Sequence, residues 1–200
     1  AVVVVPKELV SNPELFVPIL EEFLVERLLG VPTLLHNILM YLQIHESNKT
    51  KFMLSHLRFW FSSGEALTSQ FVNEFFEYFE YDRQVLVNFF GCTEITGDVT
   101  HYAIQSSKQI SKFNRVPLGT PLPNTKIYIL NVNEMRILNE GEIGEICCAG
   151  AFVTDGYIGD KDQGYFLSNT LDTDDGKKIK FISHNFSSCL LSLQKNLQNG

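Results

Sequence analysis

Residues 85–100, V-L-V-N-F-F-G-C-T-E-I-T-G-D-V-T, place a hydroxyl and a carboxylate side by side at Thr93 and Glu94. The mostly apolar residues before Gly91 predict a short buried strand, and the glycine predicts a tight turn that exposes the two polar side chains. Ligands of α/β proteins bind at the carboxyl ends of strands. A hydroxyl and a carboxylate in that position suit a phosphate oxygen and a divalent cation. This stretch is therefore the candidate for the protein's chemistry.

The segments before this stretch predict the sheet that would hold it. Residues 2–5, V-V-V-V, and residues 57–61, L-R-F-W-F, have the β-branched and aromatic character of buried parallel strands. Apolar residues at helical spacing predict helices over residues 13–29, 34–45 and 68–79, the last with an aromatic stripe typical of a core. The order strand, helix, strand, helix, strand predicts a mostly parallel sheet with helices on its faces.

The second half of the chain has a different pattern. Residues 126–130 and 145–148 alternate or run apolar at strand length. Between them, residues 131–134 and 139–141 are rich in turn-forming types. We therefore expect a smaller, hairpin-rich β region over residues 117–160, so that the fold class is α/β with an appended β-rich subdomain.

Composition bounds the class of protein. The chain has 200 residues, is 44% hydrophobic and carries a net charge of −7, which allows a buried core and argues against a nucleic-acid surface. The apolar start is too short for a membrane span, and without an initiator Met we expect the sequence to begin inside a longer protein. The four cysteines, Cys92, Cys147, Cys148 and Cys189, lack metal-ligand spacing, which favours reduced thiols in a cytoplasmic protein. Two of them are sequence neighbours and would point to opposite faces of a strand.

Four motifs, in order, resemble those of adenylate-forming (AMP-binding) enzymes, which include acyl-CoA synthetases, luciferases and the adenylation domains of nonribosomal peptide synthetases. Residues 88–94, N-F-F-G-C-T-E, resemble the family's N-x-Y-G-x-T-E, and residues 62–67, S-S-G-E-A-L, resemble its S-G-E-x-L turn. Residues 117–121, P-L-G-T-P, resemble P-x-G-x-P. Residues 141–157 resemble G-E-x-G-E-L followed by two spaced glycines and a tyrosine. Each motif alone is weak, and the ordered set is a strong signal.

The resemblance implies ATP and Mg²⁺ as cofactors and assigns roles to the first motif. Thr93 would contact phosphate and Glu94 would hold Mg²⁺, which makes them the expected catalytic pair. Phe90 would lie against adenine, where the family more often has tyrosine. The alternative is that Thr93 and Glu94 form a solvated turn. The residues expected at the nucleotide are Gly64, Glu65, Asn88, Phe89, Phe90, Gly91 and Thr93.

The resemblance also suggests an acyl substrate. The positions that line the acyl side chain in peptide-synthetase domains correspond here to Phe61, Ser63, Phe89, Gly97 and Asp98. Ser63 and Asp98 together resemble the residues found at these positions in domains that activate β-alanine, including the insect β-alanyl-amine synthases. An amino group one carbon further from the carboxylate needs a counter-charge at a different place in the pocket. The alternative is that Asp98 caps a turn.

The implied function is ATP-dependent activation of a small amino acid, with β-alanine favoured, as an aminoacyl-AMP. Transfer would follow to the phosphopantetheine thiol of a carrier domain in the same full-length chain, with no nucleic acid or membrane as partner. One alternative is an acyl-CoA synthetase for a fatty or aromatic acid, which Asp98 disfavours because a carboxylate at this position would be buried beside hydrocarbon. The other alternative is a truncated, non-catalytic fragment.

The sequence also departs from the family. The phosphate loop with its lysine and the small domain with the catalytic lysine are absent. Where the family has R-T-G-D after an aromatic residue, residues 182–185 read I-S-H-N after Phe181. We therefore expect the 200-residue chain alone to be nearly inactive. The expected divisions are residues 1–116 for the α/β part of the adenylation domain, 117–180 for its β-rich subdomain and 181–200 for an unmatched tail.

Overall fold

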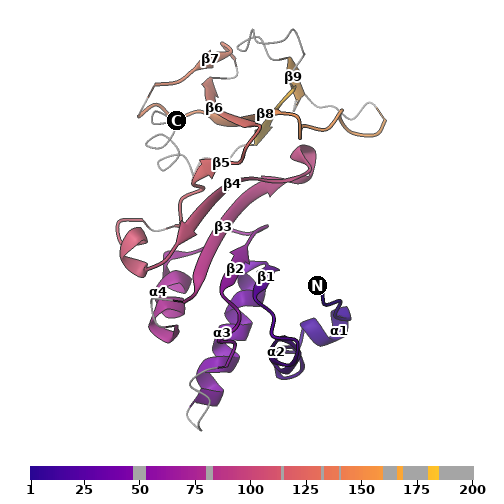
Figure 1. The fold of residues 1–200 in the computed structure, drawn as a ribbon. Coiled ribbons are helices and arrows are strands. Elements are labelled where there is room, and N and C mark those ends of the chain that lie inside the picture. Colours follow the sequence, from indigo (N-terminus) through magenta and orange to yellow (C-terminus); the bar gives the residue numbers. More distant parts are fainter. Residues whose placement is uncertain are drawn as a thin grey trace. The chain divides into compact units, whose positions relative to one another are not determined.

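The computed structural model describes residues 1–46, 53–79, 83–113, 115–131, 133–139, 141–159, 166–168 and 180–184. They group into two compact units. The first unit comprises Ala1–Asn88 and Ala103–Val116, and the second comprises Phe89–Tyr102 and Pro117–Gly200. Within the described ranges the strands form two five-stranded sheets, with the orders β1-β2-β3-β4-β5 and β7-β6-β8-β10-β9 (Figure 1).

The first unit contains the parallel strands that were expected from the alternation of strands and helices. β1 (Arg27–Gly30), β2 (Phe59–Ser62) and the start of β3 (Val85–Cys92) pair in register, so that Gly30, Ser62 and Asn88 lie level at one end. α3 (Pro32–Glu46) connects the first two strands, and α4 (Ser69–Tyr78) connects the next two. The α/β fold class is therefore confirmed, and the chain order brings the carboxyl ends of the three strands to the same edge.

Aromatic packing on β2 forms the core of the first unit. Trp60 is fully buried, and its ring centroid lies 5.4 Å from that of Phe75 and 5.3 Å from that of Phe79. The indole Nε1–H donates to the carbonyl of Leu57 at 3.1 Å, which satisfies its polar atom. Thr68 caps α4 by accepting a hydrogen bond from a backbone N–H. The expected helix with an aromatic core stripe is confirmed.

Two expectations for the first thirty residues are wrong. Residues 2–5 form no strand, and Val2 and Val4 are 90% and 88% exposed. Pro6 instead leads directly into α1 (Lys7–Val10), and the valines pair with no neighbouring strand among the described residues. The helix expected over residues 13–29 is α2 (Pro13–Glu22), which is followed by Leu24 at a φ of +49° and then by β1. A left-handed residue cannot continue a right-handed helix.

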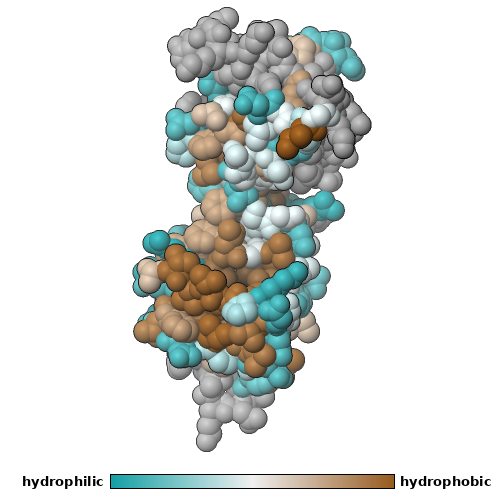
Figure 2. Space-filling view, turned by 90° about the vertical axis from the view of Figure 1, so that its right-hand side faces the viewer, coloured by the Kyte–Doolittle hydropathy of each residue, from teal (hydrophilic) through white to brown (hydrophobic). Residues whose placement is uncertain are grey.

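Apolar side chains gather on one exposed face of the first unit (Figure 2). β1 lies at the end of its sheet and pairs with β2 alone among the strands that the structure describes. The exposed large apolar side chains on and near α1, α2 and β1 are Val2, Val3, Val4, Leu15, Phe23, Leu24, Leu29 and Val31. An open strand edge beside exposed apolar surface is a pairing and aggregation hazard.

The second unit is built from short antiparallel strands, as the turn-rich sequence predicted. Its elements are η1 (Thr93–Ile95), β4 (Gly97–Ile104), β5 (Thr120–Pro121), β6 (Thr125–Asn131), β7 (Arg136–Ile137), β8 (Glu145–Gly150), β9 (Phe166–Ser168) and β10 (Lys180–His184). β8 pairs with β6 and with β10, both antiparallel. A further short helix, η2 (Ser107–Ile110), belongs to the first unit.

The neighbouring cysteines on β8 confirm the expected alternation of side chains. Cys148 packs into a buried cluster that contains Ile95 and Ile127, whereas Cys147 packs with Leu130 and Ala149. Burial is the main cause that raises the pKa of both thiols to about 12. These thiols therefore act as small core residues that stay protonated at neutral pH.

Candidate functional site

The turn after β2 holds the first group of expected site residues. Phe61 is the half-buried third residue of β2, and Ser63 follows the strand and donates its backbone N–H to the carbonyl of Gly30 at 3.2 Å. Gly64 is exposed and has a φ of +86°. The hydroxyl of Thr33 donates to Oε1 of Glu65 at 3.4 Å. These contacts tie the turn to the end of β1 and the start of α3, within the first unit.

Two buried polar side chains mark the carboxyl ends of the parallel strands. Ser62 and Asn88 are partners in the register of β2 and β3, and both are buried. Among the residues that the structure describes, none forms a hydrogen bond with Oγ of Ser62. A buried hydroxyl without a partner costs free energy, and the large majority of buried polar atoms in proteins have a partner. The expected nucleotide residue Asn88 therefore lies beside a second polar position that the sequence did not single out.

The turn after β3 begins two residues later than the sequence predicted. Gly91 lies inside β3, and the chain turns through η1, with Thr96 at a φ of +58° and Gly97 at a φ of +128°. A Cβ atom added at Gly91 would lie 1.9 Å from the carbonyl oxygen of Gly97 and 2.4 Å from Cα of Asp98. The expectation of a turn at Gly91 is therefore wrong. The glycine serves the close approach of the next strand rather than a change of direction.

Thr93 and Glu94 occupy the first two positions of η1. Thr93 is exposed, and Glu94 is half-buried. The Tyr157 hydroxyl donates to Oε1 of Glu94, and the Thr154 backbone N–H donates to the Glu94 carbonyl at 2.8 Å. Burial, and then a hydrogen bond to the Glu94 carboxylate, raises the pKa of the Cys92 thiol to about 11. The carboxylate therefore accepts a hydrogen bond from the tyrosine and has the Cys92 thiol as a close neighbour.

The remaining expected residues lie on the second unit. Phe90 packs against the buried cluster of β4, β6 and β8 side chains, and Phe89 is half-buried. Gly97 is exposed, and Asp98 is half-buried on β4. The roles of these residues toward adenine and the acyl group stay predictions.

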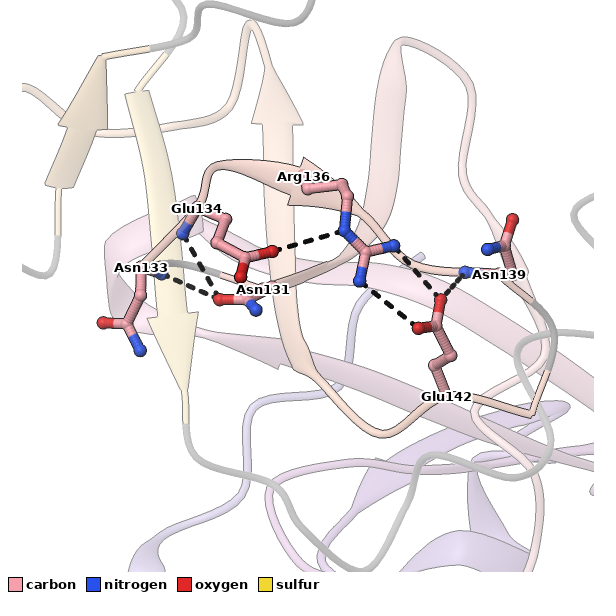
Figure 3. A network of polar contacts seen from close by, with 6 residues as sticks. All are labelled: Asn131, Asn133, Glu134, Arg136, Asn139 and Glu142. Atoms are coloured by element: carbon pink, nitrogen blue, oxygen red, sulfur yellow. Dashed lines mark hydrogen bonds and ion pairs between the residues drawn. The ribbon is translucent and has the colours of Figure 1, made fainter.

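One residue of the fourth motif, Glu142, belongs to a network of polar contacts around β7 (Figure 3). The Arg136 guanidinium donates to both carboxylate oxygens of Glu142 at 3.3 Å and to Glu134 at 3.4 Å. The Asn139 backbone N–H also donates to Glu142, at 2.6 Å. The guanidinium is the main cause that lowers the pKa of the Glu142 carboxyl. Glu142 therefore fixes the turn around β7, a role that the sequence pattern did not reveal.

Two further properties bear on the class of site. Across the residues with a described structure, no helix is both long enough and apolar enough to cross a membrane. In the same part of the chain, no group of three or more His, Cys, Asp or Glu side chains is placed to hold a metal ion. A cation at Glu94 would therefore take its other ligands from outside that set, as Mg²⁺ does when it binds with substrate phosphates.

Nonribosomal peptide synthetases are among the curated relatives of the chain. It is 41% identical over 171 residues to the beta-alanyl-bioamine nonribosomal peptide synthetase ebony of Drosophila melanogaster, an alignment that covers 86% of this chain and 19% of that protein. It is 35% identical over 158 residues to a mycosubtilin synthase of Bacillus subtilis, an alignment that covers 78% of this chain and 6% of that protein. The chain therefore spans a small part of the relatives that it matches.

Solved structures show the same fold. One is the N-terminal subdomain of Klebsiella oxytoca NpsA in complex with 3-hydroxybenzoyl-AMSN. The match covers 92% of this chain and 42% of the NpsA chain, with a TM-score of 0.69 and 22% sequence identity. A family model described as AMP-binding enzyme matches residues 1–158. The model covers most of the chain and all four motifs, and so the chain belongs to the AMP-binding enzyme family.

Proposed function

We propose that the protein containing these residues activates the carboxylate of a small amino acid with ATP. A carboxylate oxygen attacks the α-phosphorus of ATP, the bond to pyrophosphate breaks, and an aminoacyl-AMP forms. The observation that carries this proposal is the position of the T-E pair at the end of β3, in a chain of the AMP-binding family. Phosphoryl chemistry of this kind depends on positioning and on neutralising charge.

The residues present suit Mg²⁺ and ATP. We propose that the Glu94 carboxylate holds Mg²⁺ together with the phosphates of ATP, since Mg²⁺ often binds through one or two carboxylates and a substrate. The exposed hydroxyl of Thr93 suits a hydrogen bond to phosphate. The ring of Phe90 offers a stacking surface for adenine without the hydroxyl that tyrosine would add. Gly64 and Glu65 would approach the nucleotide from the turn after β2.

We propose β-alanine as the amino acid. The support is the name of the Drosophila relative, which is 41% identical, and the carboxylate of Asp98, which suits the ammonium group of the substrate. By the same resemblance, Phe61, Ser63, Phe89 and Gly97 are the other residues proposed to contact the acyl substrate. The product would pass to the phosphopantetheine thiol of a carrier domain in a cytoplasmic synthetase. The 200-residue chain contains no R-T-G-D, and we propose that it has little activity alone.

Replacement of Asp98 by Asn tests the amino-acid proposal. In the protein expressed from its complete transcript, pyrophosphate exchange is measured with β-alanine and with propionate, which has no amino group. Removal of a charged partner costs about 1.5–3 kcal/mol, so kcat/KM for β-alanine falls by about 10- to 150-fold, while the rate with propionate is unchanged or rises.

Glu77→Gln is the matched control, because Glu77 is an exposed carboxylate on α4. It leaves the exchange rates with both acids unchanged. Equal losses for β-alanine and propionate in Asp98→Asn would contradict an ammonium contact. Exchange that depends on a fatty or aromatic acid, and not on any amino acid, would replace the proposal with acyl-CoA synthesis.

A further inference from the structure

The loop that follows β8 is bonded to the turn that carries Thr93 and Glu94. The Thr154 backbone N–H donates to the Glu94 carbonyl at 2.8 Å, and the Thr96 hydroxyl donates to the carbonyl of Phe152. The Tyr157 hydroxyl donates to Oε1 of Glu94 across 63 positions of sequence. All of these residues belong to the second unit. The loop therefore contacts both the backbone and the carboxylate of the candidate cation ligand.

We propose that Tyr157 is a positioning residue that orients the Glu94 carboxylate for Mg²⁺–ATP, an inference that rests on the proposed role of Glu94. A glutamate side chain has three rotatable bonds, and a donor on one oxygen restricts them before the cation arrives. Hydrogen-bond partners of metal ligands fix the orientation of those ligands in this way. The tyrosine hydroxyl is then part of the site, although it does not touch phosphate or metal.

The surroundings of Tyr157 support an orienting role. Its ring meets that of Phe166 edge-on, with centroids 5.5 Å apart and an interplanar angle of 77°, so the phenol is itself held. The backbone of the same loop is bonded to the turn through the Thr154 N–H and the Glu94 carbonyl, so the hydroxyl reaches the Glu94 carboxylate from a segment that is itself bonded to the turn.

The alternative is that Tyr157 only fastens the loop, and one matched pair of variants separates the two roles. Tyr157→Phe removes the hydroxyl and keeps the ring against Phe166. Thr96→Val removes a different side-chain bond between turn and loop, the one to the carbonyl of Phe152, without touching the carboxylate. Each variant removes one hydroxyl at an exposed position, so gross unfolding is not expected from either.

The experiment measures binding of Mn²⁺–ATP to the protein expressed from its complete transcript, by water proton relaxation, and binding of metal-free ATP in EDTA. Tyr157→Phe is expected to raise the dissociation constant of Mn²⁺–ATP by about 10-fold, the lower end of the effect of losing a ligand's hydrogen-bond partner. The dissociation constant of metal-free ATP stays the same. Thr96→Val changes both constants by less than about twofold.

Glu94→Gln separates failure of this inference from failure of the proposed function. If Glu94→Gln binds Mn²⁺–ATP as tightly as the parent, Glu94 is no cation ligand and the proposed function of this residue fails. If Glu94→Gln weakens binding and Tyr157→Phe does not, only the positioning role is overturned. The positioning role is also overturned if Thr96→Val weakens Mn²⁺–ATP binding as much as Tyr157→Phe does. It is overturned too if adding Tyr157→Phe to Glu94→Gln weakens binding by a further 10-fold. Neither effect would act through the Glu94 carboxylate.

Discussion

Substitution of Gly91 by Ala should separate β3 from the chain that returns after the T-E turn. The added Cβ would lie 1.9 Å from the Gly97 carbonyl oxygen, 2.4 Å from Cα of Asp98 and 2.5 Å from the Gly97 carbonyl carbon. All three neighbours are backbone atoms, so no side chain can rotate away. A tolerable contact of about 3 Å requires the two segments to move apart by about 1 Å, and overpacking of this kind costs about 1–3 kcal/mol or more.

The displacement falls between Thr93 and Asp98, the residues proposed to contact phosphate and the amino group. A misplacement of about 1 Å can cost about 100-fold in rate. We therefore expect kcat/KM for pyrophosphate exchange to fall about 100-fold in Gly91→Ala, with a lower midpoint of thermal unfolding. Both are measured on the protein expressed from its complete transcript.

Gly141→Ala provides the comparison. A Cβ atom at Gly141, which lies outside the candidate site residues, would meet nothing within 4 Å, and the residue has a φ of +93°. That substitution strains the backbone without a clash, at a cost of about 1–3 kcal/mol. It should lower the unfolding midpoint while the rate falls less than in Gly91→Ala. Parental activity and stability in Gly91→Ala would refute the close approach of the two segments.

Two further predictions concern the cores of the units. Trp60→Ala removes a fully buried ring that packs on Phe75 and Phe79. It should lower the free energy of unfolding by about 3–5 kcal/mol, seen as a fall in the unfolding midpoint and in soluble yield. An unchanged midpoint would contradict the packing. The raised pKa values of Cys147 and Cys148, both about 12, mean that these thiols hold protons which the unfolded chain releases near pH 9. Their contribution to stability is present below pH 9 and is lost as the pH rises to about 12. The unfolding midpoint of the double variant Cys147→Ala, Cys148→Ala should therefore fall less steeply between pH 9 and 12 than that of the parent. Identical pH profiles of the two proteins would contradict the raised thiol pKa values.

Long, strongly patterned segments were predictable from the sequence. The aromatic stripe of α4 follows helical spacing and is buried against Trp60 as expected. The apolar stretches of β3, β6 and β8 are strands close to their expected bounds. In each of these, local propensity and tertiary burial favour the same structure.

The errors fall where a pattern fits two structures. Four consecutive valines suit a buried strand, yet residues 2–5 are largely exposed and pair with nothing in the described chain. The true first strand, Arg27–Gly30, is only four residues long, and its R-L-L-G extended the apolar pattern of the preceding helix. A short run of apolar residues does not distinguish a strand from a helix end, and pairing partners decide the outcome.

The site was predictable as motifs but not as contacts. The glycine before the T-E pair suggested a turn, whereas the structure uses it for close approach of the backbone. The bond from Tyr157 to Glu94 joins residues 63 positions apart, which no local pattern reveals. The unpartnered hydroxyl of Ser62 beside Asn88 was hidden for the same reason, since only strand register brings the two together.

Amino-acid-dependent exchange of labelled pyrophosphate into ATP tests the central claim most directly. The protein expressed from its complete transcript is assayed with Mg²⁺, ATP and each common amino acid in turn, β-alanine included, with a reaction without amino acid as the baseline. Exchange that rises above the baseline with β-alanine, and that falls in Glu94→Gln, is the predicted result. Exchange at the baseline with every amino acid would contradict the proposed activation of an amino acid.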